Sequence, residues 1–160
     1  MKRQALLITA TAVLLAASAG PSSARGSCTQ GGVTIHGSVV MVYCGPARAT
    51  VTYGGKTYVF TQGSCNTAVA GVVGVNIGMN QMTGPLPNKF KGIIMSFPSR
   101  NGAHTTGASA GWSLPPKSVV LANPRVVISG GGTRGTFSGT ATLAGNGPSL
   151  GAATGTFRCS

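Results

Sequence analysis

The chain has 160 residues, of which 12 are Lys or Arg and none is Asp or Glu, so its formal net charge is +12. Without a side-chain carboxylate, the chain cannot build a complete Ser-His-Asp triad, a paired-carboxylate glycosidase site, or a Ca²⁺ or Mg²⁺ site made of carboxylates. We therefore expect a protein that is not an enzyme and that carries no metal or other cofactor. The excess positive charge favours attraction to anionic surfaces, which weakens as salt is added.

The N-terminus has the anatomy of a secretory signal peptide. Lys2 and Arg3 precede an uncharged, mostly apolar stretch, and small residues allow cleavage after Ala19 or Ala24. The apolar stretch is shorter than the ~20 residues that a helix needs to cross a bilayer, which favours a cleaved signal over a membrane anchor. We expect a signal peptide over residues 1–24, no transmembrane segment after cleavage, and a secreted or cell-envelope-associated protein.

Residues 25–160 are expected to form one domain made of strands. Gly accounts for 26 residues of the chain, and short β-branched runs are separated by Gly, Pro and Asn, without helical periodicity. The strongest local signal is a hairpin in which Gly54-Gly55 joins two alternating runs, 49–53 and 56–60. Further strands are expected at 33–43, 72–77, 92–97, 117–121, 125–129, 134–143 and 153–159.

Two expected loops and one short repeated sequence complete the pattern. Residues 79–89 and 99–111 are expected to be loops, the second of them mobile. The tripeptide Gly-Thr-Phe occurs at 135–137 and again at 155–157, which predicts two adjacent antiparallel strands with similar facing positions. About eight short strands in all predict an all-β fold, either an antiparallel β-sandwich or a half-open barrel.

Four cysteines in an exported chain indicate two disulfides, and three pairings are possible. The most economical pairing joins Cys28 to Cys44 and Cys65 to Cys159. Lipidation of Cys28 is not expected, because Arg25 stands where bacterial lipoproteins need an apolar residue. A metal site is not expected either, since the chain has no Cys-x-x-Cys motif and its two histidines are far apart in the sequence.

Candidate contact residues are few, and a catalytic cysteine is not among them. His36-Gly37-Ser38 with Cys44 shares residue types with cysteine transpeptidases, but the order of the motif fails and a disulfide explains the cysteine better. Trp112 follows the expected mobile loop and is the preferred exposed contact. Among the ten cations that follow residue 24, Lys89 and Lys91 form the only local pair, although specific nucleic-acid binding is not expected from so sparse a cluster.

Several segments resemble the mycobacterial lipoprotein antigen family typified by LpqH. The resemblance spans residues 49–160 in order, and the matching segments are Val51-Thr52-Tyr53-Gly54-Gly55-Lys56, Cys65-Asn66-Thr67-Ala68, Gly74-Val75-Asn76-Ile77-Gly78, Ser138-Gly139-Thr140-Ala141-Thr142 and Phe157-Arg158-Cys159-Ser160. It implies a β-rich surface antigen with a disulfide from Cys65 to Cys159. This chain departs from the family in lacking the lipidation cysteine, the Ser/Thr-rich tether after it and all acidic residues, and in having the extra Cys28 and Cys44.

These observations together predict a monomeric, non-enzymatic surface protein whose cationic exterior contacts anionic cell-envelope polymers or a host surface. The alternative is a binding module that holds a small molecule or a lipid in an apolar cavity between two sheets.

Overall fold

The computed structural model describes residues 28–67, 69–85 and 88–160, so the predicted signal peptide lies outside the described residues. The described part consists of twelve β-strands and contains no helix. The strands are β1 (Gly31–Ile35), β2 (Ser38–Val42), β3 (Arg48–Tyr53), β4 (Lys56–Phe60), β5 (Gly63–Asn66), β6 (Val72–Thr83), β7 (Gly92–Pro98), β8 (Gly102–His104), β9 (Ser109–Leu114), β10 (Lys117–Ser129), β11 (Arg134–Leu143) and β12 (Ser149–Arg158). No helix in this part is long and apolar enough to cross a membrane.

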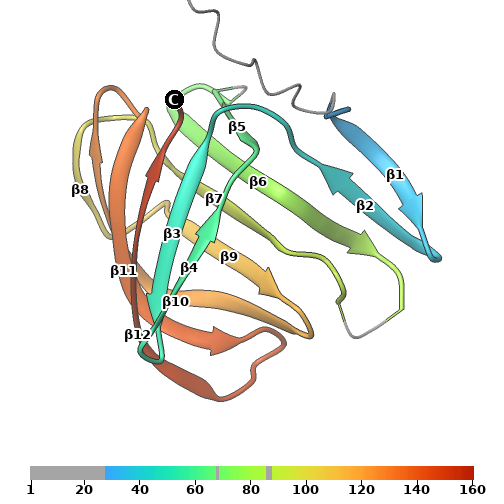
Figure 1. Ribbon diagram of the computed structural model, residues 1–160. Helices are drawn as coiled ribbons and strands as arrows, with labels where there is room; N and C mark the ends of the chain where they lie inside the picture. The colour runs from blue at the N-terminus through green and yellow to red at the C-terminus, as the bar shows by residue number, and fades with distance from the viewer. Residues whose placement is uncertain (1–27, 68, 86–87) are drawn as a thin grey trace, which may run out of the picture.

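All twelve strands belong to one antiparallel sheet that is not closed into a barrel (Figure 1). The strand order is β1-β2-β6-β7-β9-β10-β11-β12-β3-β4, while β5 pairs with β6 and β8 pairs with β10 beside this path. The sheet folds over on itself, so that β3 and β12 lie in front of β6, β7 and β9. The predicted all-β antiparallel class is confirmed, with twelve strands where about eight were expected.

One hydrophobic core fills the space inside the folded sheet. Its members come from both halves of the strand order, and the rings of Phe97 on β7 and Phe157 on β12 lie 4.4 Å apart between centroids. These two strands are far apart in the sheet, so their contact closes the fold in the manner of two packed layers. The predicted hairpin is confirmed as β3–β4, and its inward-facing Val51 and Phe60 join this core.

The Gly-Thr-Phe echo is confirmed in register across β11 and β12. Gly135 lies opposite Phe157, Thr136 opposite Thr156, and Phe137 opposite Gly155. Each phenylalanine therefore covers a glycine of the neighbouring strand on the buried side of the sheet. The repeated tripeptide is thus a reciprocal packing device, and it leaves two threonines facing each other on the outside.

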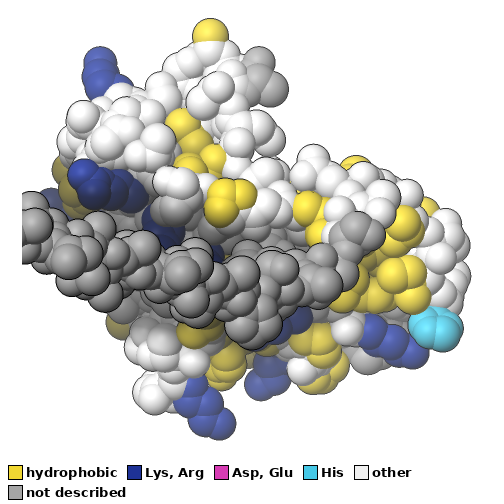
Figure 2. Space-filling model, turned by 45° about the horizontal axis from the view of Figure 1, so that its top comes forward, with side chains coloured by type: hydrophobic (Ala, Val, Ile, Leu, Met, Phe, Trp, Pro, Cys, Tyr) yellow, Lys and Arg dark blue, Asp and Glu magenta, His cyan; other side chains and the backbone are white. Residues whose placement is uncertain are grey.

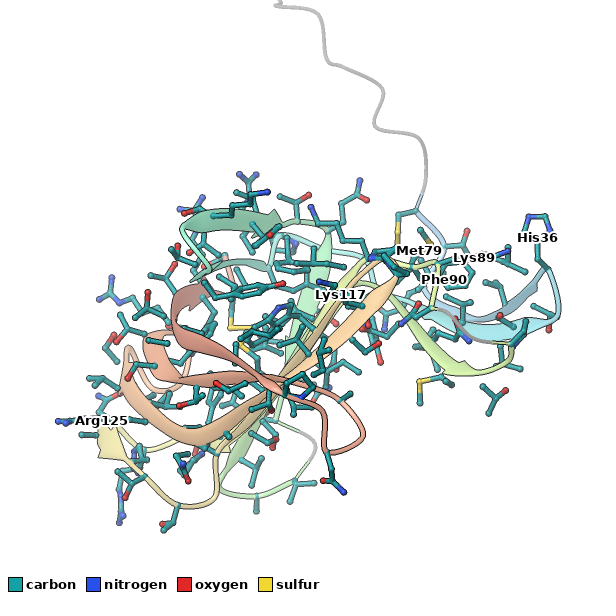
Figure 3. All side chains as sticks on the ribbon, turned by 90° about the horizontal axis from the view of Figure 1, so that it is seen from below. His36, Met79, Lys89, Phe90, Lys117 and Arg125 are labelled. Atoms are coloured by element: carbon teal, nitrogen blue, oxygen red, sulfur yellow. A yellow bond between two sulfur atoms is a disulfide. The ribbon has the colours of Figure 1, made fainter. Side chains whose placement is uncertain are left out.

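The expected strand 33–43 is wrong, because the chain reverses in its middle. His36 and Gly37 both adopt positive φ angles, 46° and 77°, as a two-residue hairpin turn of the primed type requires. The segment therefore forms two strands, β1 and β2. Together with the end of β6 they project from the main body as an arm, with His36 at its tip (Figure 3).

Three other expected segments differ from the structure. The expected mobile loop 99–111 contains β8 and the start of β9, which pair with β10 and β7. The two strands expected on either side of Asn123-Pro124 form the single strand β10, in which the register shifts between Ala122 and Arg125. A bulge accommodates a proline that cannot donate to the ladder, so the strand continues past it. The expected loop 79–89 begins later, because β6 runs to Thr83.

The predicted disulfides are confirmed as Cys28–Cys44 and Cys65–Cys159. The first joins the residues that flank the β1–β2 hairpin at the base of the arm. The second joins β5 to the residue after β12, and the two halves of the pair are 94 residues apart in the sequence. Two disulfides are consistent with an oxidising environment outside the cytoplasm.

We predict a stability profile that is flat in acid and falls in alkali. Acid unfolding usually comes from protonating carboxylates that are paired in the native state, and this chain has no Asp or Glu. Burial raises the pKa of Tyr43 and Tyr53 above the ordinary value of 10.0, so the folded state binds more protons than the unfolded state in that range and loses stability as pH rises through it. Thermal melts from pH 3 to pH 11 measure this, and a large fall between pH 6 and pH 3 would contradict it.

Candidate functional site

The structure corrects the prediction that Trp112 is an exposed contact. Trp112 is only 2% exposed and lies on the central strand β9, opposite Ile93 on one side and Val119 on the other. Because side chains alternate along a strand, its position on the inner face sends the indole into the core. The expected loop before Trp112 is ordered as strand, which removes the reason for expecting exposure.

Lys89 and Lys91 are exposed on either side of the buried Phe90, near the base of the arm (Figure 3). The Nζ atom of Lys91 lies 5.3 Å from the centroid of the Phe60 ring, within the range of a cation–π contact. Lys91 also lines an open cavity of about 240 Å³ with apolar side chains that include Met79. The role of Lys89 and Lys91 as contacts to a partner stays a prediction.

A row of three arginines crosses the outer face of the sheet. Arg48 on β3 lies directly opposite Arg158 on β12, and Arg158 lies directly opposite Arg134 on β11. Directly opposed residues of antiparallel strands point to the same side, with Cβ atoms about 5 Å apart. All three side chains are exposed, and the strand neighbours Ala49 and Phe157 of Arg48 and Arg158 are turned inward to the core. We call these three residues the arginine row.

Hydroxyl side chains continue the same face beyond the arginine row. The next row places Thr50, Thr156 and Thr136 opposite one another, two residues further along each strand. The row after it contains Thr57, Thr52, Thr154, Ser138 and Arg125. The hydroxyls of Thr50 and Thr156 are 2.9 Å apart, and those of Thr52 and Thr57 are 2.8 Å apart, so they hydrogen-bond between strands. Open hollows of about 370 and 270 Å³ lie along these rows.

The electrostatics of this face are unusual for a β-sheet. Like charges directly opposite each other on neighbouring strands destabilise the pair, and natural sheets commonly place opposite charges there. No Asp or Glu exists in the chain to compensate the arginine row. Guanidinium groups present several donors in a planar fork that matches phosphate, sulfate and carboxylate oxygens. The arrangement can therefore hold an anion chemically, although it provides no nucleophile or general base.

The three arginines are spread over more than a hundred residues of the sequence, so no local cluster of charges indicated the row. The repeated Gly-Thr-Phe tripeptide could have predicted part of the row. A register that sets Gly135 opposite Phe157 also sets Arg134 opposite Arg158. After residue 24, the Lys89–Lys91 pair was the only pair of cations close together in the sequence. Figure 2 shows Lys and Arg side chains at several separate places on the face in view.

The residues weighed for catalysis are not brought together. His36 lies in the turn at the tip of the arm, whereas Cys44 is bonded to Cys28 at the other end of the β1–β2 hairpin. In the ranges 28–67, 69–85 and 88–160, no three His, Cys, Asp or Glu residues gather as a metal site would require.

Comparison with known proteins adds no relative to this picture. The chain matches no protein-family model, no curated protein and no solved structure. The function is therefore inferred from the geometry of the face itself.

Proposed function

We propose that this is a secreted or cell-envelope-associated, non-enzymatic protein that binds anionic polymers of the envelope or of a host surface. The observation that supports the proposal best is the arginine row, in which Arg48, Arg158 and Arg134 are cross-strand neighbours without any acidic side chain to pair with. Such a row is unfavourable in the free protein, and an anionic polymer lying across the strands would relieve the repulsion. The proposed envelope location also accords with the resemblance to the lipoprotein antigens.

The two rows of mostly Thr side chains next to the arginine row suit the same partner. Hydroxyls both donate and accept hydrogen bonds, so they can contact polymer oxygens next to the charged groups. Because the rows repeat across adjacent strands, the face offers similar contacts at a regular spacing of about 5 Å, the distance between paired strands. A polymer with repeating anionic groups fits this regularity better than a single small ion does.

We predict that the variant Arg48→Gln/Arg134→Gln/Arg158→Gln binds immobilised inorganic polyphosphate at least about tenfold more weakly than the unmodified protein. Exposed ion pairs contribute up to about 1 kcal/mol each, and about 1.4 kcal/mol corresponds to a factor of ten. Biolayer interferometry at several salt concentrations measures the affinity and its salt dependence. Thermal melts should show equal or higher stability, because the substitutions remove repulsion.

The matched control is Lys89→Gln/Lys91→Gln/Lys117→Gln, which removes the same amount of charge from exposed residues that are not part of the arginine row. We expect it to weaken binding much less. If both triple variants lose affinity equally, the attraction is a property of net charge and the proposed face is wrong. A greater loss in the control would instead support the contacts predicted at Lys89 and Lys91.

The alternative of a lipid held between two sheets has less support. The inner space is occupied by Trp112 and by the contact between Phe97 and Phe157. Mass spectrometry of the natively secreted protein, under non-denaturing conditions, would reveal a co-purified lipid if this alternative held.

A further inference from the structure

An open cavity lies at the end of the folded sheet where the β3–β4 and β9–β10 turns meet the start of β12. Its volume is about 410 Å³, which is within the range of small-molecule sites in proteins. The cavity is separate from the arginine row, with which it shares no residue. Its lining includes Tyr53, Lys56, Tyr58, Leu114, Lys117 and Leu150.

Two tyrosines form an aromatic surface in this cavity. The rings of Tyr53 and Tyr58 are stacked, with centroids 5.2 Å apart and an angle of 29° between their planes. Tyr53 is supported from the core by Trp112, whose ring centroid is 5.6 Å away. Because Trp112 is almost completely buried, the tyrosine pair is held by a rigid neighbour. Both tyrosines are half-buried, and both line the cavity.

Two exposed lysines complete the cavity from opposite sides. Lys56 lies opposite Tyr53 in the β3–β4 hairpin, and Lys117 begins β10 opposite Leu114. The chain has no Asp or Glu that could neutralise either ammonium group. The cavity therefore combines an aromatic surface, apolar walls and two positive charges.

We propose that this cavity binds a sugar ring that carries an anionic group. The negative faces of tyrosine rings attract the positively polarised C–H groups of a sugar, and the tyrosine hydroxyls can hydrogen-bond to ring substituents. Lys56 and Lys117 supply charge for a carboxylate, sulfate or phosphate on the ring. A neutral sugar would leave both lysines without a partner, and a simple inorganic anion would leave the aromatic surface unused.

The single tryptophan of the chain makes the test direct. Ligand contact at Tyr53 should change the fluorescence of Trp112, since the two rings are neighbours. We expect trigalacturonate to produce a saturable change in Trp112 fluorescence. Its fully methyl-esterified form has the same rings without the charge, and we expect it to bind at least tenfold more weakly. Isothermal titration calorimetry with both ligands provides a readout that does not depend on Trp112.

Variants distinguish binding in this cavity from attraction that depends only on the net charge of the protein. Lys56→Gln/Lys117→Gln and, separately, Tyr58→Ala should each weaken trigalacturonate binding about tenfold, whereas Lys89→Gln/Lys91→Gln should leave it unchanged. Thermal melts confirm that each variant is folded. Equal binding of the ester, or equal loss in the two lysine pairs, would overturn the proposal. Binding of oligo-dT but not of trigalacturonate would also overturn it, by showing a preference for nucleobases.

The test of the cavity by trigalacturonate binding is independent of the test of the proposed polymer-binding face. The arginine-row variant should show the same change in Trp112 fluorescence with trigalacturonate as the unmodified protein, because that change reports contact at Tyr53. The Lys56→Gln/Lys117→Gln variant should keep its affinity for polyphosphate within about twofold. Either proposal can therefore fail while the other stands.

Discussion

Replacing Cys65 and Cys159 together with Ala is expected to lower the free energy of unfolding by about 4 to 5 kcal/mol, according to the loop-entropy treatment of cross-links. The disulfide spans 94 residues of sequence, so its loss releases a large loop in the unfolded chain. Removing Cys28 and Cys44 in the same way should lower it by about 3 kcal/mol, because that loop spans only 16 residues. Urea unfolding curves of the two double variants measure both values.

The position of Cys65–Cys159 adds to the expected effect. β5 pairs with β6 and β12 pairs with β11 and β3, so the bond connects parts of the sheet that are not neighbours in the strand order. Cys65 also packs against the hydrophobic core, and Ala is chosen to avoid introducing a buried hydroxyl. An equal or larger loss from the Cys28–Cys44 pair would contradict the argument, because that bond only closes the base of the arm.

Gly155→Ala is expected to destabilise the protein by about 1 to 3 kcal/mol, the usual effect of overfilling a packed core. A Cβ atom at position 155 would lie 2.2 Å from the Cζ atom of Phe137 and 2.4 Å from the carbonyl oxygen of Thr50. The carbonyl belongs to the neighbouring strand β3, so it cannot move away without breaking the ladder. The added methyl group must therefore displace Phe137 or distort the sheet.

Gly32→Ala is the matched control, because Gly32 also lies in a strand and a Cβ there would meet no atom within 4 Å. We expect it to be neutral or slightly stabilising, since Ala lowers the entropy of the unfolded chain. Thermal and urea unfolding of both variants compare the two sites. A Gly155→Ala variant as stable as Gly32→Ala would show that the reciprocal Gly–Phe packing is not tight.

Local chemistry explains which features were predictable. The Gly54-Gly55 hairpin followed from two residues that tolerate positive φ between alternating runs. The pairing of β11 with β12 followed from a repeated tripeptide in which size alternates between glycine and phenylalanine. The number of disulfides followed from an even number of cysteines together with the predicted signal peptide, while three pairings were open. In each case the information lies within one short segment or in a simple count.

Other features depend on which strands become neighbours. His36-Gly37 was not recognised as a turn, because residues other than glycine are uncommon at positive φ and the run around His36 reads as one strand. Trp112 was expected outside because its flanks looked like a loop, whereas pairing with β7 and β10 places it in the core. The arginine row exists only because β3, β12 and β11 lie side by side.

The sequence by itself determined the absence of carboxylate chemistry, the positive charge, the all-β class and two of the local pairings, since composition and alternation act within short segments. Only the tertiary structure decided where the charges gather and which aromatic side chains reach a cavity. The physical reason is that a strand specifies which of its residues share a face, but the neighbours on that face come from distant strands, selected by packing of the whole core.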